Sequence, residues 1–224
     1  MACIGNTAGE VAIWILPGVI TIDGEFSHPI PEEPLHTFQC HQMGANSVAL
    51  ANIGCSIDGS THKYQVLLAS GGDDQALTCS VIEIEIDKSD ISKKVMHLRG
   101  GVIAKESSSS AIKGVKVIGN YSRGFNVYVV GYDQRLVLWS VDIDNLRQYP
   151  QKCLKFLSSA PVDVFDVNCL DACLLVEENG ISKEFLLVGG QGMEILSFDP
   201  NPLLAARALR KSDHLLVTCG AGKF

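Results

Sequence analysis

A short pattern occurs four times along this chain: an apolar run, a turn of small or polar residues, and a second apolar run. The second run closes at an aromatic residue in three copies and at serine in the other: Trp14, Ser80, Trp139 and Phe198. These closing positions are 66, 59 and 59 residues apart. Such regular spacing is typical of repeat architectures, in which each unit buries its apolar surface against its neighbours. We therefore expect a series of similar units rather than a single active-site domain.

The apolar runs predict strands. They are short, rich in Val, Ile, Leu and Tyr, and separated by clusters of Gly, Asp, Asn and Ser, as pleated segments joined by tight turns are. The fullest unit offers four strands, around residues 36–40, 47–53, 64–70 and 76–86. Four antiparallel strands make one blade of a β-propeller. The predicted fold class is all-β, a partial β-propeller of about three and a half blades of four-stranded antiparallel sheet.

The units divide the chain into six predicted segments. They are the C-terminal half of a blade (1–16), a proline-rich loop (17–34), two blades (35–87 and 88–142), a divergent blade (143–199) and a tail (200–224). The second segment is predicted as a loop because proline cannot donate to a sheet ladder. The tail has helical propensity at 203–211 and a later apolar run, so a short helix with a strand and a disordered segment both remain open.

Charge and cysteine content limit the possible partners and compartments. The net charge is −7 and the basic residues are scattered, which disfavours direct binding of DNA or RNA because phosphates require a clustered basic face. The eight cysteines include no Cys-x-x-Cys pair, so buried reduced thiols are favoured over a zinc site. This predicts a cytosolic or nuclear compartment. The sequence supports neither a signal peptide nor a membrane helix.

Three features could be interpreted as sites of chemistry. The segment 71–74 (Gly-Gly-Asp-Asp) could form a metal or phosphate loop, and 189–192 (Gly-Gly-Gln-Gly) resembles a nucleotide loop. Hairpin turns explain both better, since glycine supplies positive φ and no Gly-Lys-Ser/Thr ending is present. His41 is not part of a nucleophile motif, and a structural role between strands is favoured over catalysis. We predict no catalytic residue, no cofactor and no metal.

The segments 69–74 and 131–139 resemble the WD-repeat family, in which Gly and Asp form a hairpin turn before a strand that ends in Trp. Cys40-His41 stands where the family has Gly-His. The resemblance implies that His, Ser or Thr, Asp and Trp are joined by hydrogen bonds across the strands of a blade. The residues carried over as blade signature are His41, Ser70, Asp74, Asp133, Trp139 and Trp14. In this chain Ser80 replaces one Trp, Val129 fills one Ser/Thr position, and serines near 109 stand in place of one His.

A narrower resemblance covers roughly residues 1–199. The segments 35–42, 67–74, 133–136 and 188–194 are similar to the C-terminal part of the WD repeat-containing protein 6 family. The resemblance implies a fragment of a longer protein. It also implies a non-catalytic, cytoplasmic partner of an FtsJ-type tRNA ribose 2′-O-methyltransferase that acts at the wobble position, with tRNA contacted through the complex. The alternative is a general WD-repeat interaction scaffold in ubiquitin ligation, trafficking or signalling. The sequence does not indicate which surface binds the partner.

Overall fold

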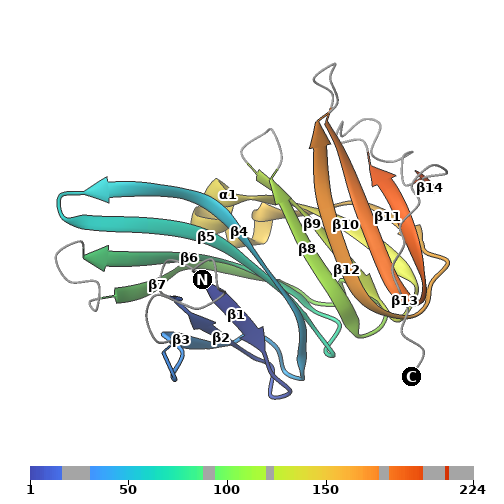
Figure 1. Ribbon diagram of the computed structural model, residues 1–224, viewed down its shortest axis with the longest axis horizontal. Coiled ribbons are helices and arrows are strands. Elements are labelled where there is room, and N and C mark those ends of the chain that lie inside the picture. Colours follow the sequence, from blue (N-terminus) through green and yellow to red (C-terminus); the bar gives the residue numbers. More distant parts are fainter. Residues whose placement is uncertain (17–30, 88–93, 120–123, 177–181, 199–209, 212–224) are drawn as a thin grey trace, which may run out of the picture.

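The computed structural model describes residues 1–16, 31–87, 94–119, 124–176, 182–198 and 210–211. Within these residues the chain consists mainly of antiparallel strands, with two short helices. The strands form four sheets of three or four strands that follow one another in chain order (Figure 1). The predicted all-β fold class is confirmed. The described sheets form an open series and do not close into a ring.

The first sheet has the order β1-β2-β3, formed by Ala2–Gly5, Glu10–Trp14 and His36–Gln39. The second has the order β4-β5-β6-β7, formed by Ala45–Asp58, Thr61–Gly72, Leu77–Asp87 and Lys94–Ala104. The third has the order β8-β9-β10-β11, formed by Ile112–Gly119, Gly124–Gly131, Arg135–Asp142 and Leu154–Pro161. The fourth has the order β12-β13-β14, formed by Phe165–Val176, Ser182–Phe198 and Arg210–Lys211.

The sheets are offset by one strand from the units predicted from the sequence. Strand β3 was expected to open the blade at 35–87, but it pairs with β2. In the same way β7 completes the second sheet and β11 completes the third. The reason is that each of these strands runs back beside the strand that precedes it in the chain, and the crossing to the next sheet comes only afterwards.

Three apolar layers fill the spaces between consecutive sheets. The first lies between the first and second sheets and includes Ile13, Leu68 and Ile82. The second lies between the second and third sheets, and the third between the third and fourth. At the inner edges β4 contacts β8, and β8 contacts β12. Each interior sheet therefore buries both faces, which explains why buried residues follow one another without alternation at 67–72 of β5, 81–84 of β6, 125–131 of β9 and 136–138 of β10.

The chain reverses direction within β13. Ile195 lines the same cavity as Leu186 and Leu187, although a straight strand would hold these residues about 30 Å apart. The two halves of β13 therefore lie side by side, as Figure 1 also shows. The reversal falls in the glycine-rich segment 189–192, where Gly192 has a φ of 127°. This agrees with the predicted hairpin turn there.

Two short helices between β10 and β11 were not predicted. Helix α1 spans Ile143–Gln148 and α2 spans Pro150–Cys153. The carboxylate of Asp142 caps α1 by accepting a hydrogen bond from the backbone N–H of Asn145. Ile143 and Leu146 face inward and cover the end of the second apolar layer. The cap and the i, i+3 apolar pair were available signals in the sequence.

Most of the tail lies outside the described residues. Arg210 and Lys211 form β14, which pairs with Leu196 and Ser197 of β13. These two residues are extended rather than helical, so their pairing with β13 overrides the helical propensity of 203–211 at its end. Of the predicted proline-rich loop, residues 31–34 are described and form neither strand nor helix.

Candidate functional site

Three hairpins share one turn geometry at the same end of their sheets. The turns are residues 6–9 between β1 and β2, 72–75 between β5 and β6, and 131–134 between β9 and β10. In each, the first carbonyl accepts from the N–H of the fourth residue, at 3.2, 3.3 and 3.2 Å. The fourth residues are Gly9, Gln75 and Gln134, with φ of 84°, 64° and 56°. Each stands five positions before Trp14, Ser80 or Trp139, so the sequence repeat is also a structural repeat.

The fourth residue of each turn also bonds to the segment that leads to the next sheet. The carbonyl of Gly9 accepts from the N–H of His41 at 3.0 Å. The carbonyl of Gln75 accepts from Ser107 at 3.1 Å, and that of Gln134 from Val162 at 2.8 Å. Each hairpin tip therefore fixes the path of the chain as it crosses to the following sheet.

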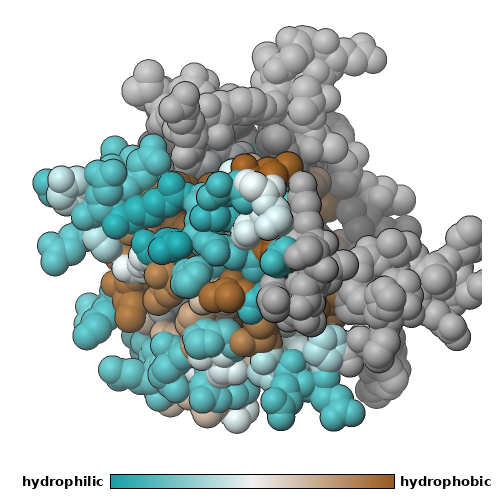
Figure 2. All heavy atoms as spheres, turned by 90° about the vertical axis from the view of Figure 1, so that its left-hand side faces the viewer, coloured by the Kyte–Doolittle hydropathy of each residue, from teal (hydrophilic) through white to brown (hydrophobic). Residues whose placement is uncertain are grey.

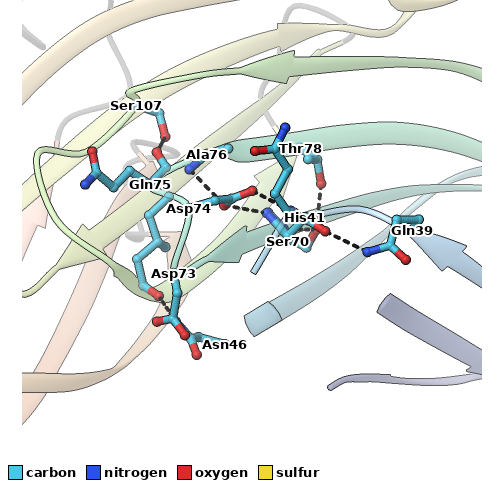
Figure 3. Close-up of polar contacts among 12 residues, drawn as sticks. Gln39, His41, Asn46, Ser70, Asp73, Asp74, Gln75, Ala76, Thr78 and Ser107 are labelled. Carbon is cyan, nitrogen blue, oxygen red and sulfur yellow. Dashed lines mark hydrogen bonds and ion pairs between the residues drawn. The ribbon is translucent and has the colours of Figure 1, made fainter. Parts of the chain in front are cut away.

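His41 joins the first crossing segment to the second sheet through a chain of polar contacts (Figure 3). Its Nδ1 lies 2.9 Å from Asp74 Oδ1, and its Nε2 lies 2.9 Å from Ser70 Oγ. Ser70 Oγ is in turn 2.6 Å from Thr78 Oγ1. With Nδ1–H donating to the carboxylate, Nε2 accepts from Ser70 and Ser70 accepts from Thr78, so every group in the chain is satisfied.

Three predicted signature residues, His41, Ser70 and Asp74, are thus brought together. The side chain of Asp74 also accepts from the backbone N–H groups of Gln42 and Ala76, at 3.0 and 3.2 Å. The sequence analysis missed Thr78, which takes the end of the network where the family has Trp. Thr78 stands directly opposite Ser70 in the β5–β6 pair, so the strand register was the signal that could have identified it.

Glycine at the first position of the second and third turns has a steric reason. A Cβ at Gly72 would lie 2.7 Å from Cγ of the His41 ring, and one at Gly131 would lie 2.5 Å from Ser108 Oγ. At each of these glycines the backbone lies against the side chain, His41 or Ser108, that is hydrogen-bonded to the aspartate of the turn. This close packing accounts for these glycines, whereas the positive φ expected of glycine falls on Gln75 and Gln134 instead.

Asp74, His41 and Ser70 stand in the order of a carboxylate, imidazole and hydroxyl triad. The Ser70 side chain, however, has no exposed surface, and its hydroxyl is shared with Thr78. A nucleophile must reach a substrate carbonyl. Ser70 is buried on β5 and is not accessible to a substrate. The geometry therefore favours a structural role for this group.

In the third sheet the equivalent network is split. Asp133 Oδ2 accepts from Ser109 Oγ at 2.6 Å and from the Ser109 N–H at 3.1 Å. Ser109 and its neighbour Ser108, which also donates to Asp133, occupy the place that His41 has in the second sheet, as their sequence positions indicated. Val129 stands where Ser70 does and has no hydroxyl. Trp139 Nε1 is accordingly buried with no hydrogen-bond partner among the residues that the structure describes, so Asp133 and Trp139 are not joined.

Trp14 is half-buried near the end of β2. Its neighbours Val11 and Ile13 are fully buried against the second sheet. Because side chains alternate along a strand, Trp14 lies on the opposite face of the first sheet. Trp139 also lies on the face of its sheet that points toward the preceding one, so the two tryptophans have equivalent orientations.

A cavity of about 580 Å³ adjoins the His41 network. Its lining includes His41 and Asp74, together with Met43 and Ile103, which are 56% and 57% exposed. Lys105 and Glu106 add opposite charges to the same wall. The wall is mixed in character, which suits contact with a polypeptide better than with a polyanion.

Several basic side chains are paired with carboxylates. Lys63 contacts Glu85 at 3.3 Å, Arg99 contacts Glu83 at 2.5 Å, and Lys113 contacts Asp73 at 3.1 Å. The end of the molecule formed by β4–β7 is largely hydrophilic with hydrophobic patches between (Figure 2). Lysine and arginine side chains that are already neutralised by these carboxylates offer little attraction to phosphate groups.

In the described part of the chain, no cluster of three or more His, Cys, Asp or Glu side chains could hold a metal ion. The seven described cysteines are free thiols, and Cys219 lies outside the described residues. Burial raises the pKa of Cys79 above its ordinary value and raises that of Cys153 to about 11. These two thiols are therefore poor nucleophiles.

A buried carboxylate between the third and fourth sheets was not predicted. Glu184 on β13 is 1% exposed and accepts from Asn126 Nδ2 at 3.0 Å and from the Tyr128 hydroxyl. Both partners lie on β9. Desolvation raises the pKa of Glu184 above its ordinary value, although the two donors oppose that effect. Burial and the nearby carboxylate raise the pKa of Tyr128.

Replacing Glu184 by glutamine should alter the pH dependence of folding. Because the folded pKa is raised, folding favours the protonated carboxyl, and its contribution to stability is lost as the pH rises from about 4.3 through the folded pKa. Glutamine cannot ionise. The free energy of unfolding of Glu184→Gln minus that of the wild type, measured by urea denaturation, should therefore increase as the pH rises above about 4.3. A constant difference would contradict the raised pKa.

Comparison with known proteins adds no assignment. No protein-family model matches this chain, and no curated protein matches it significantly. Among the described residues no helix has the length and apolar character needed to cross a membrane.

Proposed function

We propose that this chain is a non-catalytic interaction module of the WD-repeat type and the partner of an FtsJ-type tRNA ribose 2′-O-methyltransferase acting at the wobble position. The observation that carries the WD-repeat part is the repeated hairpin end. Three sheets share the same turn, and in the second sheet the turn aspartate is bonded to His41, which is bonded to Ser70. This matches the His, Ser and Asp part of the network that the family resemblance implied, whereas Ser80 stands in place of the Trp.

The sheets are also arranged as consecutive blades of a propeller would be. The inner strand β8 contacts both β4 and β12. An apolar layer is buried between the second and third sheets, and another between the third and fourth. Propellers present rigid loops and blade faces as recognition surfaces. The methyltransferase part of the proposal depends on the sequence resemblance of 35–42, 67–74, 133–136 and 188–194.

A partner role suits the charges of the chain. Its net charge is −7, and Lys63, Arg99 and Lys113 are paired with carboxylates. Binding to tRNA would then come through the enzyme, and this chain would contribute a protein contact in the cytoplasm. The burial of Ser70 supports a module that contributes no nucleophile of its own.

Ribose methylation at the wobble nucleotide should disappear in cells that lack the full-length gene. The measurement is nuclease digestion of purified tRNAs followed by mass spectrometry, with ribose methylation elsewhere in the same tRNAs as the internal control. The full gene should restore the mark, and the methyltransferase should co-purify with its product. Unchanged wobble methylation would refute the tRNA part and favour a general interaction scaffold in ubiquitin ligation, trafficking or signalling.

A further inference from the structure

The second sheet lacks an aromatic pair that the third sheet has. In the third sheet Trp139 on β10 stands opposite Phe156 on β11, and their rings meet edge to face with centroids 5.7 Å apart. Trp139 follows the turn residue Asp133 by six positions, as Ser80 follows Asp74. Ser80 on β6 stands opposite Gly101 on β7. Serine and glycine thus occupy the two positions that hold aromatic rings in the neighbouring sheet.

A cavity is present at this point. It has a volume of about 220 Å³ and lies between β3 of the first sheet and the facing side of the second sheet. Its lining includes Phe38, Leu68, Thr78, Ser80, Ile82 and Leu98. A dry apolar cavity of about 150 Å³ in another protein is large enough to bind benzene. This cavity has room for a ring of indole size.

The lining combines an apolar slot with a polar edge and an exposed rim. Ser80 Oγ has no hydrogen-bond partner within the described chain, and it lies 2.9 Å from the position of a Cβ built on Gly101. Leu98 and Ile103, which also line the cavity, are 55% and 57% exposed. The rim therefore offers apolar surface beyond the cavity itself, which a free small ring would leave uncovered.

We propose that this cavity receives the aromatic side chain of a partner polypeptide, a tryptophan ring above all, with its N–H directed to Ser80. The ring would take the volume that Trp139 and Phe156 fill in the third sheet, and the partner chain beside it would cover Leu98 and Ile103. Buried aromatic anchors of this kind dominate many protein interfaces. The inference rests on the part of the proposed function that makes the chain a binding module, and not on tRNA methylation.

The test measures the binding of two probes, indole and N-acetyltryptophanamide, to the full chain. Each probe is titrated against the protein, and binding is detected by saturation-transfer NMR. Both should bind saturably, and N-acetylalaninamide should not. Ser80→Trp fills the cavity from β6, and Gly101→Val fills it from β7, where the rotatable Ser80 hydroxyl is the described atom nearest to the new Cβ. Each should weaken binding of both probes at least tenfold. Ser56→Trp, an exposed position on β4 of the same sheet, should bind both probes as the wild type does.

Binding of neither probe to the wild type would overturn the proposal. So would wild-type affinity in folded Ser80→Trp, or in Gly101→Val if the first variant does not fold. Binding of indole without N-acetyltryptophanamide would also overturn it, because the cavity would then be closed to a ring attached to a main chain. These outcomes are independent of the wobble-methylation experiment, so failure of one proposal can be distinguished from failure of the other.

Discussion

Trp139→Ala is expected to lower the free energy of unfolding by up to about 3–5 kcal/mol, the cost of truncating a fully buried aromatic side chain, because the Trp139 ring is partly buried. The Trp139 ring packs on the apolar layer between the second and third sheets and meets Phe156 edge to face. Alanine would leave a cavity between two sheets and remove the aromatic contact. Urea denaturation followed by far-UV circular dichroism measures the effect, since the variant also loses a fluorescent residue.

Trp139→Phe is the matched control. It keeps a benzene ring beside Phe156 and removes the five-membered part of the indole with its N–H, which has no hydrogen-bond partner among the described residues. Because no described hydrogen bond is lost and less volume is removed than by alanine, we expect a cost well below that of Trp139→Ala. Equal, large losses in both variants would show that the N–H has a partner in solution. A negligible effect of Trp139→Ala would show that the ring is exposed.

Asp74→Ala is expected to cost about 2–4 kcal/mol, because it leaves several donors unpaired near a buried group. The carboxylate accepts from His41 Nδ1–H and from the N–H groups of Gln42 and Ala76. His41 is 3% exposed, so water cannot readily replace the lost acceptor. The same urea denaturation measures this effect.

The adjacent aspartate supplies the control for that variant. Asp73 contacts Asn46 and Lys113, and its side chain is 36% exposed, so water can reach the carboxylate. Asp73→Ala should therefore change stability by no more than about 1 kcal/mol. If the two variants were equally unstable, the hairpin turn rather than the His41 network would be the source of the effect.

The strands and hairpins could be predicted from the sequence because their signals are local. Gly and Asp at 71–74 and 131–133 mark turns, and the apolar runs on either side mark strands. His41, Ser70 and Asp74 were identified through family resemblance rather than through pairing. Once β5 and β6 are known to be in register, Thr78 follows, since it stands opposite Ser70.

The features that were missed depend on contacts between distant segments. Whether β3, β7 and β11 pair with the strand before or after them is decided by three-dimensional arrangement, and periodicity does not report it. Glu184 looked like an ordinary polar strand residue, but Asn126 and Tyr128 on another sheet enclose it. The cavity at Ser80 likewise required the positions of β3 and β7 relative to β6.

The two ends of the strands differ in how freely their connections can vary. At one end the turns 6–9, 72–75 and 131–134 are equal in length, and each is tied to the next sheet by a backbone hydrogen bond. At the other end, the connections 15–35, 88–93 and 143–153 differ widely. An insertion in the first set would break the link that positions the neighbouring sheet, and one in 143–153 would disturb α1, whose Ile143 and Leu146 cover an apolar layer. A tag or label is accordingly best inserted at Gly59, in the β4–β5 turn, where φ is 57° and no atom of the described residues beyond its chain neighbours lies within 4 Å of a built Cβ.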